Sequence, residues 1–198
     1  MTEESAHDRV MTGKTWNEFC DTLKAAGNVI IAEGSPANPL DRSEGFRYLS
    51  RLTRAPLEQF LEYADPLAPV LHRPVHETAK IGADNPDNYY QSAAISGAYE
   101  YRIKGHRGTI HYLDFGTQSD GVAGSGTSSQ AGHLDASDLE MDADGRFEIL
   151  LSCEEKPGNW LRMEPDTTQL IVRQTFLDRD VEKPADLVIE RIGGDGKP

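Results

Sequence analysis

The spacing of the apolar residues changes once along this chain, and the change separates two kinds of structure. Ahead of a proline-rich segment, apolar residues recur at helical spacing, as Trp16, Phe19 and Leu23 do. Beyond that segment they alternate with polar residues, as Phe147 and Ile149 do. The first pattern is typical of amphipathic helices, and the second of strands with one buried face. The sequence therefore predicts an α+β fold, with N-terminal helices followed by an antiparallel β-sandwich or jelly-roll-like domain.

Turn residues and prolines mark the expected boundaries of these parts. We expect residues 1–13 to form a disordered tail and residues 14–66 to form a helical segment. Residues 67–80 are predicted to form an extended, proline-rich connector. The antiparallel β-domain is expected at residues 81–192, and a short tail at residues 193–198.

Two glycine-containing segments are expected to lie between strands. Residues 105–108 are typical of a hairpin turn, which would pair Ile103 with Ile110 and place apolar side chains on one face. Residues 116–132 are rich in Gly, Ser, Thr and Gln and are predicted to form a long loop that is either functional or mobile.

The charge of the chain disfavours two classes of partner. With 20 Lys and Arg residues against 33 Asp and Glu residues, the formal net charge is −13. Such a surface repels phosphate backbones and anionic lipids. The N-terminal residues also lack the basic and apolar regions of a signal peptide. We therefore expect a cytoplasmic protein that has neither a nucleic-acid nor a membrane partner.

The sequence contains no motif that indicates a cofactor. It has no P-loop, no dinucleotide-binding glycine motif after a strand, and no nucleophile elbow. His72 and His76 have the spacing of metal ligands on a helix, but Pro74 between them disfavours a helix. We expect neither a cofactor nor a metal site.

The best candidates for ligand binding are Asn159, Trp160 and Arg173. Trp160 follows a Gly/Pro turn, and Arg173 lies in the middle of a predicted apolar strand. An exposed Trp stacks on sugars or aromatic rings, while Asn and Arg supply directed donors. The alternative is a Trp in the core, an Asn that stabilises a turn, and a surface Arg.

A second candidate region is the Asx-rich segment with Asp84, Asn85, Asp87 and Asn88. Clustered side-chain oxygens can bind sugar hydroxyls or a hard cation. The same residue types also form turns by bonding to their own backbone, and Pro86 favours that alternative.

Two histidines are the only catalytic candidates that this reasoning yields. His106 lies in the predicted hairpin turn and His111 beside it. A strand histidine close to an arginine stays neutral and can act as a general base. The alternative is a pair of surface histidines without a role in chemistry.

The C-terminal part of the chain resembles a known family. The segment Asn159-Trp160-Leu161, together with the following strand that carries Arg173, resembles the bacterial domain of unknown function numbered twelve-fourteen. This resemblance implies a jelly-roll-like β-domain. It implies no agreed activity and no catalytic residues.

Two further segments extend the resemblance toward the N-terminus. Residues 41–49 and 80–88 resemble the N-terminal half of longer uncharacterised bacterial proteins that carry this domain. The broader similarity spans most of residues 15–192. Those longer proteins continue into a C-terminal half that would be missing from this chain.

Three functions are consistent with these observations. The first is a β-domain that binds a small molecule or a glycan. The second is an enzyme that acts on a small organic or sugar substrate with a histidine base. The third is an assembly domain that packs on other copies, as a homo-oligomer, or on the missing C-terminal half.

Overall fold

The computed structural model describes residues 5–119 and 129–194. The chain divides into two compact units, the first ending at Arg54 and the second beginning at Ala55. N-terminal helices are followed by two mostly antiparallel four-stranded sheets, which confirms the predicted α+β fold class.

The first unit contains helices α1 (Ala6–Met11), α2 (Lys14–Ile30) and most of α3 (Pro39–Leu57). No residue from 5 to 54 is buried, and α3 has its one buried residue at Ala55. Large apolar side chains are therefore exposed, among them Trp16 at 67% and Phe46 at 45%. The helical unit has amphipathic helices but no interior of its own.

Helix α1 corrects one expectation, because it lies within the segment predicted to be a disordered tail. The side chain of Ser5 accepts a hydrogen bond from the Asp8 amide, which caps the helix N-terminus. Asp8 in the first turn also interacts favourably with the helix dipole. Residues 1–4 of the predicted tail lie outside the described residues, as do residues 195–198 at the other end.

A single π-helical turn, η1 (Glu58–Glu62), follows α3 directly. Its defining bond runs from the Tyr63 amide to the Glu58 carbonyl, at 2.8 Å. Pro56, which lies inside α3, lacks an amide donor, so the helical ladder is already incomplete where the wider turn begins.

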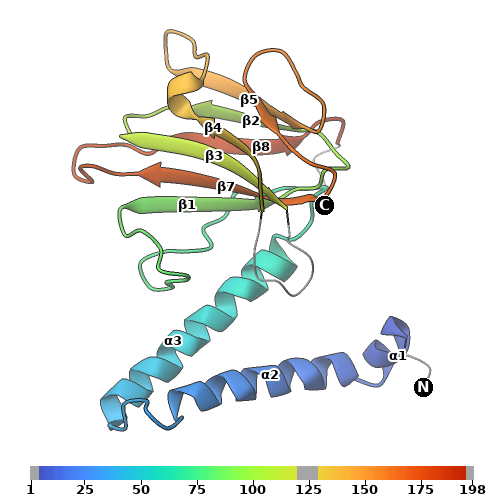
Figure 1. Ribbon diagram of the computed structural model, residues 1–198, viewed down its shortest axis with the longest axis vertical. Helices are drawn as coiled ribbons and strands as arrows, with labels where there is room; N and C mark the ends of the chain where they lie inside the picture. The colour runs from blue at the N-terminus through green and yellow to red at the C-terminus, as the bar shows by residue number, and fades with distance from the viewer. Residues whose placement is uncertain (1–4, 120–128, 195–198) are drawn as a thin grey trace. The chain divides into compact units, whose positions relative to one another are not determined.

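The second unit is a sandwich of two sheets that face one another (Figure 1). One sheet has the order β1-β7-β3-β4 and the other the order β6-β5-β2-β8. The strands of the first sheet are β1 (Asn88–Ala94), β7 (Thr167–Thr175), β3 (Tyr112–Ser119) and β4 (Ser129–Asp135). The strands of the second are β6 (Trp160–Arg162), β5 (Arg146–Ser152), β2 (Tyr101–His106) and β8 (Asp186–Arg191), and a short 3-10 turn, η2 (Ala136–Asp138), follows β4.

The apolar residues that were predicted to face the interior of the sandwich do so. Phe147, Ile149, Leu170 and Val172 are all buried in one apolar cluster between the sheets. Alternation also places Arg173 on the opposite, outer face of β7. The predicted alternation of the β-domain is thus confirmed for the strands that carry most of its core.

The predicted hairpin at residues 105–108 does not form. Strand β2 pairs with β5 and β8, whereas β3 pairs with β4 and β7 in the other sheet. The segment after β2 is held by contacts with later residues, since the Thr109 amide donates to the Lys183 carbonyl at 2.9 Å. Gly105 and His106 of the predicted turn belong to β2, and the residues after them carry the chain across to the other sheet instead of folding it back.

Strands also occupy both ends of the predicted loop at residues 116–132. Strand β3 continues to Ser119 and β4 begins at Ser129, while residues 120–128 lie outside the described residues. Gly116 and Gly132 therefore belong to paired strands.

The two open sides of the sandwich are closed in different ways. On one side the sheets touch directly, because Thr117 Oγ1 donates to the Arg162 carbonyl at 2.5 Å. On the other side the connector lies along the edges of both sheets. His72 forms a β-bridge with Ser92 of β1, and Arg191 Nε of β8 donates to the Leu67 carbonyl at 3.2 Å. Within the ranges the structure describes, no helix is both long and apolar enough to cross a membrane.

We predict that Gly132→Ala destabilises the β unit. A Cβ at Gly132 would lie 2.3 Å from the Arg162 carbonyl oxygen, so the sheets would have to move apart. Overpacking of this kind costs about 1–3 kcal/mol. Chemical denaturation of the purified variant measures the change in the free energy of unfolding.

Gly116→Ala is the matched control, on the neighbouring strand of the same sheet. Its Cβ would lie no closer than 3.8 Å to a non-adjacent residue, so its stability should stay close to that of the wild type. Equal loss of stability in the two variants would contradict the close approach of β4 to β6.

Candidate functional site

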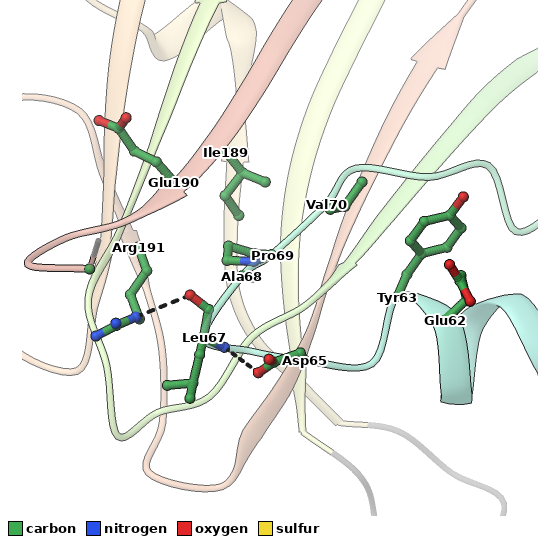
Figure 2. A pocket seen from close by; sticks show the side chains of 11 residues that line it. Glu62, Tyr63, Asp65, Leu67, Ala68, Pro69, Val70, Ile189, Glu190 and Arg191 are labelled. Atoms are coloured by element: carbon green, nitrogen blue, oxygen red, sulfur yellow. Dashed lines mark hydrogen bonds between the residues drawn. The ribbon is translucent and has the colours of Figure 1, made fainter. Parts of the chain in front are cut away.

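A cavity of about 500 Å³ lies between the connector and strand β8 (Figure 2). Its volume is within the range of small-molecule sites. Its lining comes from the end of η1, the connector and β8. The lining residues are Glu62, Tyr63, Asp65, Leu67, Ala68, Pro69, Val70, Ile189, Glu190, Arg191 and Gly194.

Tyr101 fixes the start of the connector against the sandwich. Its side chain is completely buried, and its hydroxyl donates to the Pro66 carbonyl at 3.0 Å. The same oxygen accepts a hydrogen bond from the Ser96 amide at 2.8 Å. Burial is the main reason that the pKa of Tyr101 is raised to about 12, and the negative charge of Asp65 acts in the same direction.

Leu67 lines the cavity, and both of its backbone polar groups are hydrogen-bonded. Its amide donates to Asp65 Oδ1 at 2.8 Å, and its carbonyl accepts from Arg191 Nε at 3.2 Å. Both bonds are drawn as dashed lines in Figure 2. The cavity wall therefore rests on defined contacts between the connector and β8.

The polar groups around the cavity are mostly acidic. Asp65 and Glu62 are exposed carboxylates of the connector side, and Glu190 lies on β8. Hydrogen bonding to Lys104 is the main reason that the pKa of Glu190 is lowered. The side chains that complete the wall, such as Val70 and Ile189, are apolar, so the cavity combines an apolar surface with hydrogen-bond acceptors.

A smaller cavity of about 210 Å³ lies on the other side of the connector, beside His72. The His72 ring stacks on Tyr63, which lines the larger cavity, with the ring centroids 5.0 Å apart. Both ring nitrogens of His72 are buried and have no hydrogen-bond partner among the described residues. Burial therefore lowers the pKa of His72 and keeps its imidazole neutral.

Asn159 and Trp160 lie on the second sheet and are engaged in local contacts. Asn159 Oδ1 accepts from the Glu140 amide, and its Nδ2 donates to the carbonyls of Glu140 and Glu148. Trp160 is half-buried, and its indole nitrogen donates to Ser152 Oγ at 3.0 Å. Both residues thus stabilise the fold around β5 and β6.

Arg173 lies on the first sheet, so the predicted trio is not brought together. Its Nη1 lies 3.3 Å from Asp114 Oδ2 of β3. The same carboxylate oxygen lies 3.3 Å from Nε2 of His133 on β4. This cluster was missed because its members are far apart in sequence. The one sequence signal that could have pointed to it is an arginine inside an apolar strand, which calls for a counter-charge on a neighbouring strand without identifying that strand.

The Asx-rich segment forms a turn that is fixed to the end of β7. Asn85 Oδ1 accepts from the Asp87 amide, and the Asp87 carbonyl accepts from the Phe176 amide. Asn88 Oδ1 accepts from Thr175 Oγ1, and Asp84 pairs with Lys80 at 3.0 Å. These are the contacts of a turn, which was the alternative to a binding role for this segment.

The two catalytic candidates do not form an acid–base pair. His106 is exposed and its Nδ1 accepts from the Gly108 amide at 3.2 Å. His111 is also exposed, and its carbonyl accepts from Arg107. Within residues 5–119 and 129–194, neither imidazole has a carboxylate partner. The same residues contain no group of three or more His, Cys, Asp and Glu side chains that could hold a metal ion.

One solved structure is closely similar to this chain. An uncharacterised protein from Burkholderia cenocepacia has 55% sequence identity and a TM-score of 0.87, and the match covers 96% of this chain. It covers 53% of the Burkholderia chain, so the present chain spans about half the length of that protein.

A second solved structure, of a protein from Vibrio parahaemolyticus, has 11% identity and a TM-score of 0.44 over 79% of this chain and 47% of that one. No family model matches the sequence, and no curated protein matches it. The resemblance to the twelve-fourteen domain therefore stays a prediction.

We predict that the stability of the β unit falls in alkaline solution as Tyr101 ionises. Its folded pKa of about 12 lies above the ordinary value of 10.0, so the folded state holds the proton more tightly. The stabilisation is complete below pH 10.0 and is lost as the pH rises through the folded pKa. Denaturant unfolding at a series of pH values measures this loss.

The control for this titration is Tyr101→Phe, which cannot ionise. It should be less stable at neutral pH by about 1–3 kcal/mol because two hydrogen bonds are lost. Its stability should depend less on pH across the alkaline window than that of the wild type. The same alkaline slope in both proteins would contradict the assignment to Tyr101.

Proposed function

We propose that the β unit binds a small polar molecule, such as a sugar, in the cavity between the connector and β8. The observation that supports this proposal is the cavity itself, with its volume of about 500 Å³ and its mixed lining. The Tyr63 ring and the apolar wall can pack against the carbon skeleton of a ligand. The carboxylates at the edge can accept hydrogen bonds from hydroxyl groups.

The proposed site differs from the one that the sequence favoured. The side-chain nitrogens of Asn159 and Trp160 form hydrogen bonds within the protein. Arg173 lies on the other sheet. The cavity instead uses the proline-rich connector, whose backbone is held at Pro66 and Leu67. A fixed backbone favours binding because little conformational entropy is lost when the ligand enters.

The enzyme alternative has less support than binding. It requires a histidine beside an orienting carboxylate at the substrate site. His106 and His111 both lack such a partner in the described part of the chain, and neither lines the cavity. Binding is for that reason the function we favour.

We predict that a ligand of the cavity stabilises the wild type and not a variant with a filled cavity. A thermal-shift screen with sugars, small amines and small acids identifies the compound. A ligand present at ~100 times its Kd adds ~2.7 kcal/mol to the free energy of unfolding. Val70→Trp places a large ring at the cavity wall and should remove the shift.

Val181→Trp is the matched control, because Val181 is exposed at 70% and does not line the cavity. The control should respond to the ligand as the wild type does. A compound that stabilises Val70→Trp as strongly as the wild type would contradict this site. No response to any compound in the panel would favour an assembly function.

A second candidate function is assembly with another copy of the chain through the helical unit. The observation that favours it is the absence of any buried residue from 5 to 54, although the helices are amphipathic. Helices of this kind gain most of their stability from packing of the apolar face.

We predict that light scattering gives the mass of a dimer, and that Trp16→Glu gives a monomer because it puts a charge on the exposed apolar face. Val188→Glu is the control, since Val188 is exposed at 61% on β8, outside the helical unit. A monomeric wild type at high concentration would rule out self-assembly.

A further inference from the structure

His72 links the connector to β1 and to the wall of the larger cavity. Its backbone amide donates to the Ser92 carbonyl of β1 and its carbonyl accepts from the Ser92 amide, both at 2.9 Å. Its ring stacks on Tyr63, with an angle of 24° between the ring planes. Because Tyr63 lines the larger cavity, the imidazole is in direct contact with one wall residue of the proposed ligand site.

The imidazole occupies a place that suits its neutral form. Both ring nitrogens are buried and have no hydrogen-bond partner among the described residues. A neutral imidazole carries one N–H group, whereas the charged form carries two N–H groups and a positive charge. Burial of a charged group costs far more free energy than burial of a neutral one. A proton taken up by His72 therefore disfavours the stacked position of its ring.

The groups that face the ring do not offset this cost. Burial has the largest effect and lowers the pKa of His72 from its ordinary value of 6.5. The carbonyl oxygens of Val70 and Ser92 and the negative charge of Glu58 on η1 favour the charged form, but to a smaller extent. The face of the Tyr63 ring also attracts a cation weakly. The stacked ring therefore stays neutral at a pH at which an exposed histidine takes up a proton.

The smaller cavity, of about 210 Å³, offers a charged ring both room and hydrogen-bond acceptors. Its lining residues besides His72 are all uncharged, namely Gln59, Phe60, Ala64, Ser92, Ala94, Thr168 and Gln169. The side-chain oxygens of its two glutamines can accept hydrogen bonds from an imidazolium. Arg73, the next residue of the connector, is paired with Glu77 at 3.1 Å. The ring can thus rotate toward this cavity while the backbone bridge to Ser92 stays in place.

The direction of the pH effect follows from the two positions of the ring. A ring that has turned away from Tyr63 takes up a proton with an ordinary pKa of about 6.5, whereas the pKa of the stacked ring is lower. The turned ring therefore binds the proton more tightly. The fraction of turned rings rises as the pH falls below 6.5.

We propose that protonation of His72 releases Tyr63 from its fixed place at the wall of the larger cavity, so that the cavity is controlled by pH. This inference rests on the proposed function for its meaning, because a ligand that packs on Tyr63 is then released in mildly acidic solution. The movement of the two rings itself requires no ligand. A failure of this inference is therefore distinct from a failure of the ligand site.

The test is a pH titration of the full chain by NMR, with the histidine and tyrosine rings labelled. At neutral pH the rings of His72 and Tyr63 should show a nuclear Overhauser effect, because their centroids are 5.0 Å apart. As the pH falls, the His72 signals should titrate with a midpoint below 6.5, and the effect between the rings should be lost with the same midpoint. The Ser92 amide should keep its hydrogen bond, which shows that the β unit stays folded.

Two variants test the role of the imidazole. His72→Phe keeps an aromatic ring that cannot take up a proton, so the Tyr63 signals should stay constant over the range in which His72 titrates. His111→Phe is the matched control, because His111 is exposed and lines neither cavity. In that control Tyr63 should respond to pH as it does in the wild type.

Three results would overturn the proposal. The first is a His72 midpoint at or above 6.5. The second is a contact between the two rings that persists in the protonated wild type. The third is a response of Tyr63 in His72→Phe that equals the response in the wild type. The first two results concern the wild type alone and do not depend on the folding of a variant.

Discussion

At one side of the sandwich, the carbonyl oxygen of Arg162 occupies the place that a side chain on residue 132 would need. This approach brings the edge strand β4 against β6, so the two sheets close on each other without a covering element. The opposite side, between β1 and β8, is covered by the connector, which contacts both strands. The larger cavity of the connector region lies on that covered side, against β8.

The composition of the connector explains why it covers the sandwich without filling it. Prolines lack amide donors, so a proline-rich segment cannot pair continuously with a sheet edge. The connector touches β1 through one bridge at His72 and β8 through the Leu67 carbonyl. The Tyr63 ring, which lines the larger cavity, stacks on the His72 ring, which lines the smaller one. A neutral His72 contributes to this stack because burial disfavours its charged form.

Much of the fold could be predicted from the sequence because each strand must turn its apolar residues inward. Phe147, Ile149 and Val172 were placed correctly for that reason. Strand partners could not be predicted, since alternation defines a face and not a neighbour. The turn predicted at 105–108 contains the end of β2 and the start of the crossing to the other sheet. None of the residues that line the cavity was a site candidate from the sequence, and of the cluster around Asp114 only Arg173 was. Asp114 and His133 lie in the same cluster but come from other strands, and local patterns do not record such distant contacts.

The π-helical turn at η1 has a consequence for how this region tolerates insertions and deletions. A π turn contains one residue more than an α turn, so deletion of a residue there would convert it to regular helix. A π turn and an α turn each close one full turn, so this deletion would leave the residues on either side facing the directions they face now. Tyr63 would keep its direction toward His72, on which it stacks with the ring centroids 5.0 Å apart. The wider turn is therefore the place where the helix before the cavity can lose a residue without turning the cavity lining away.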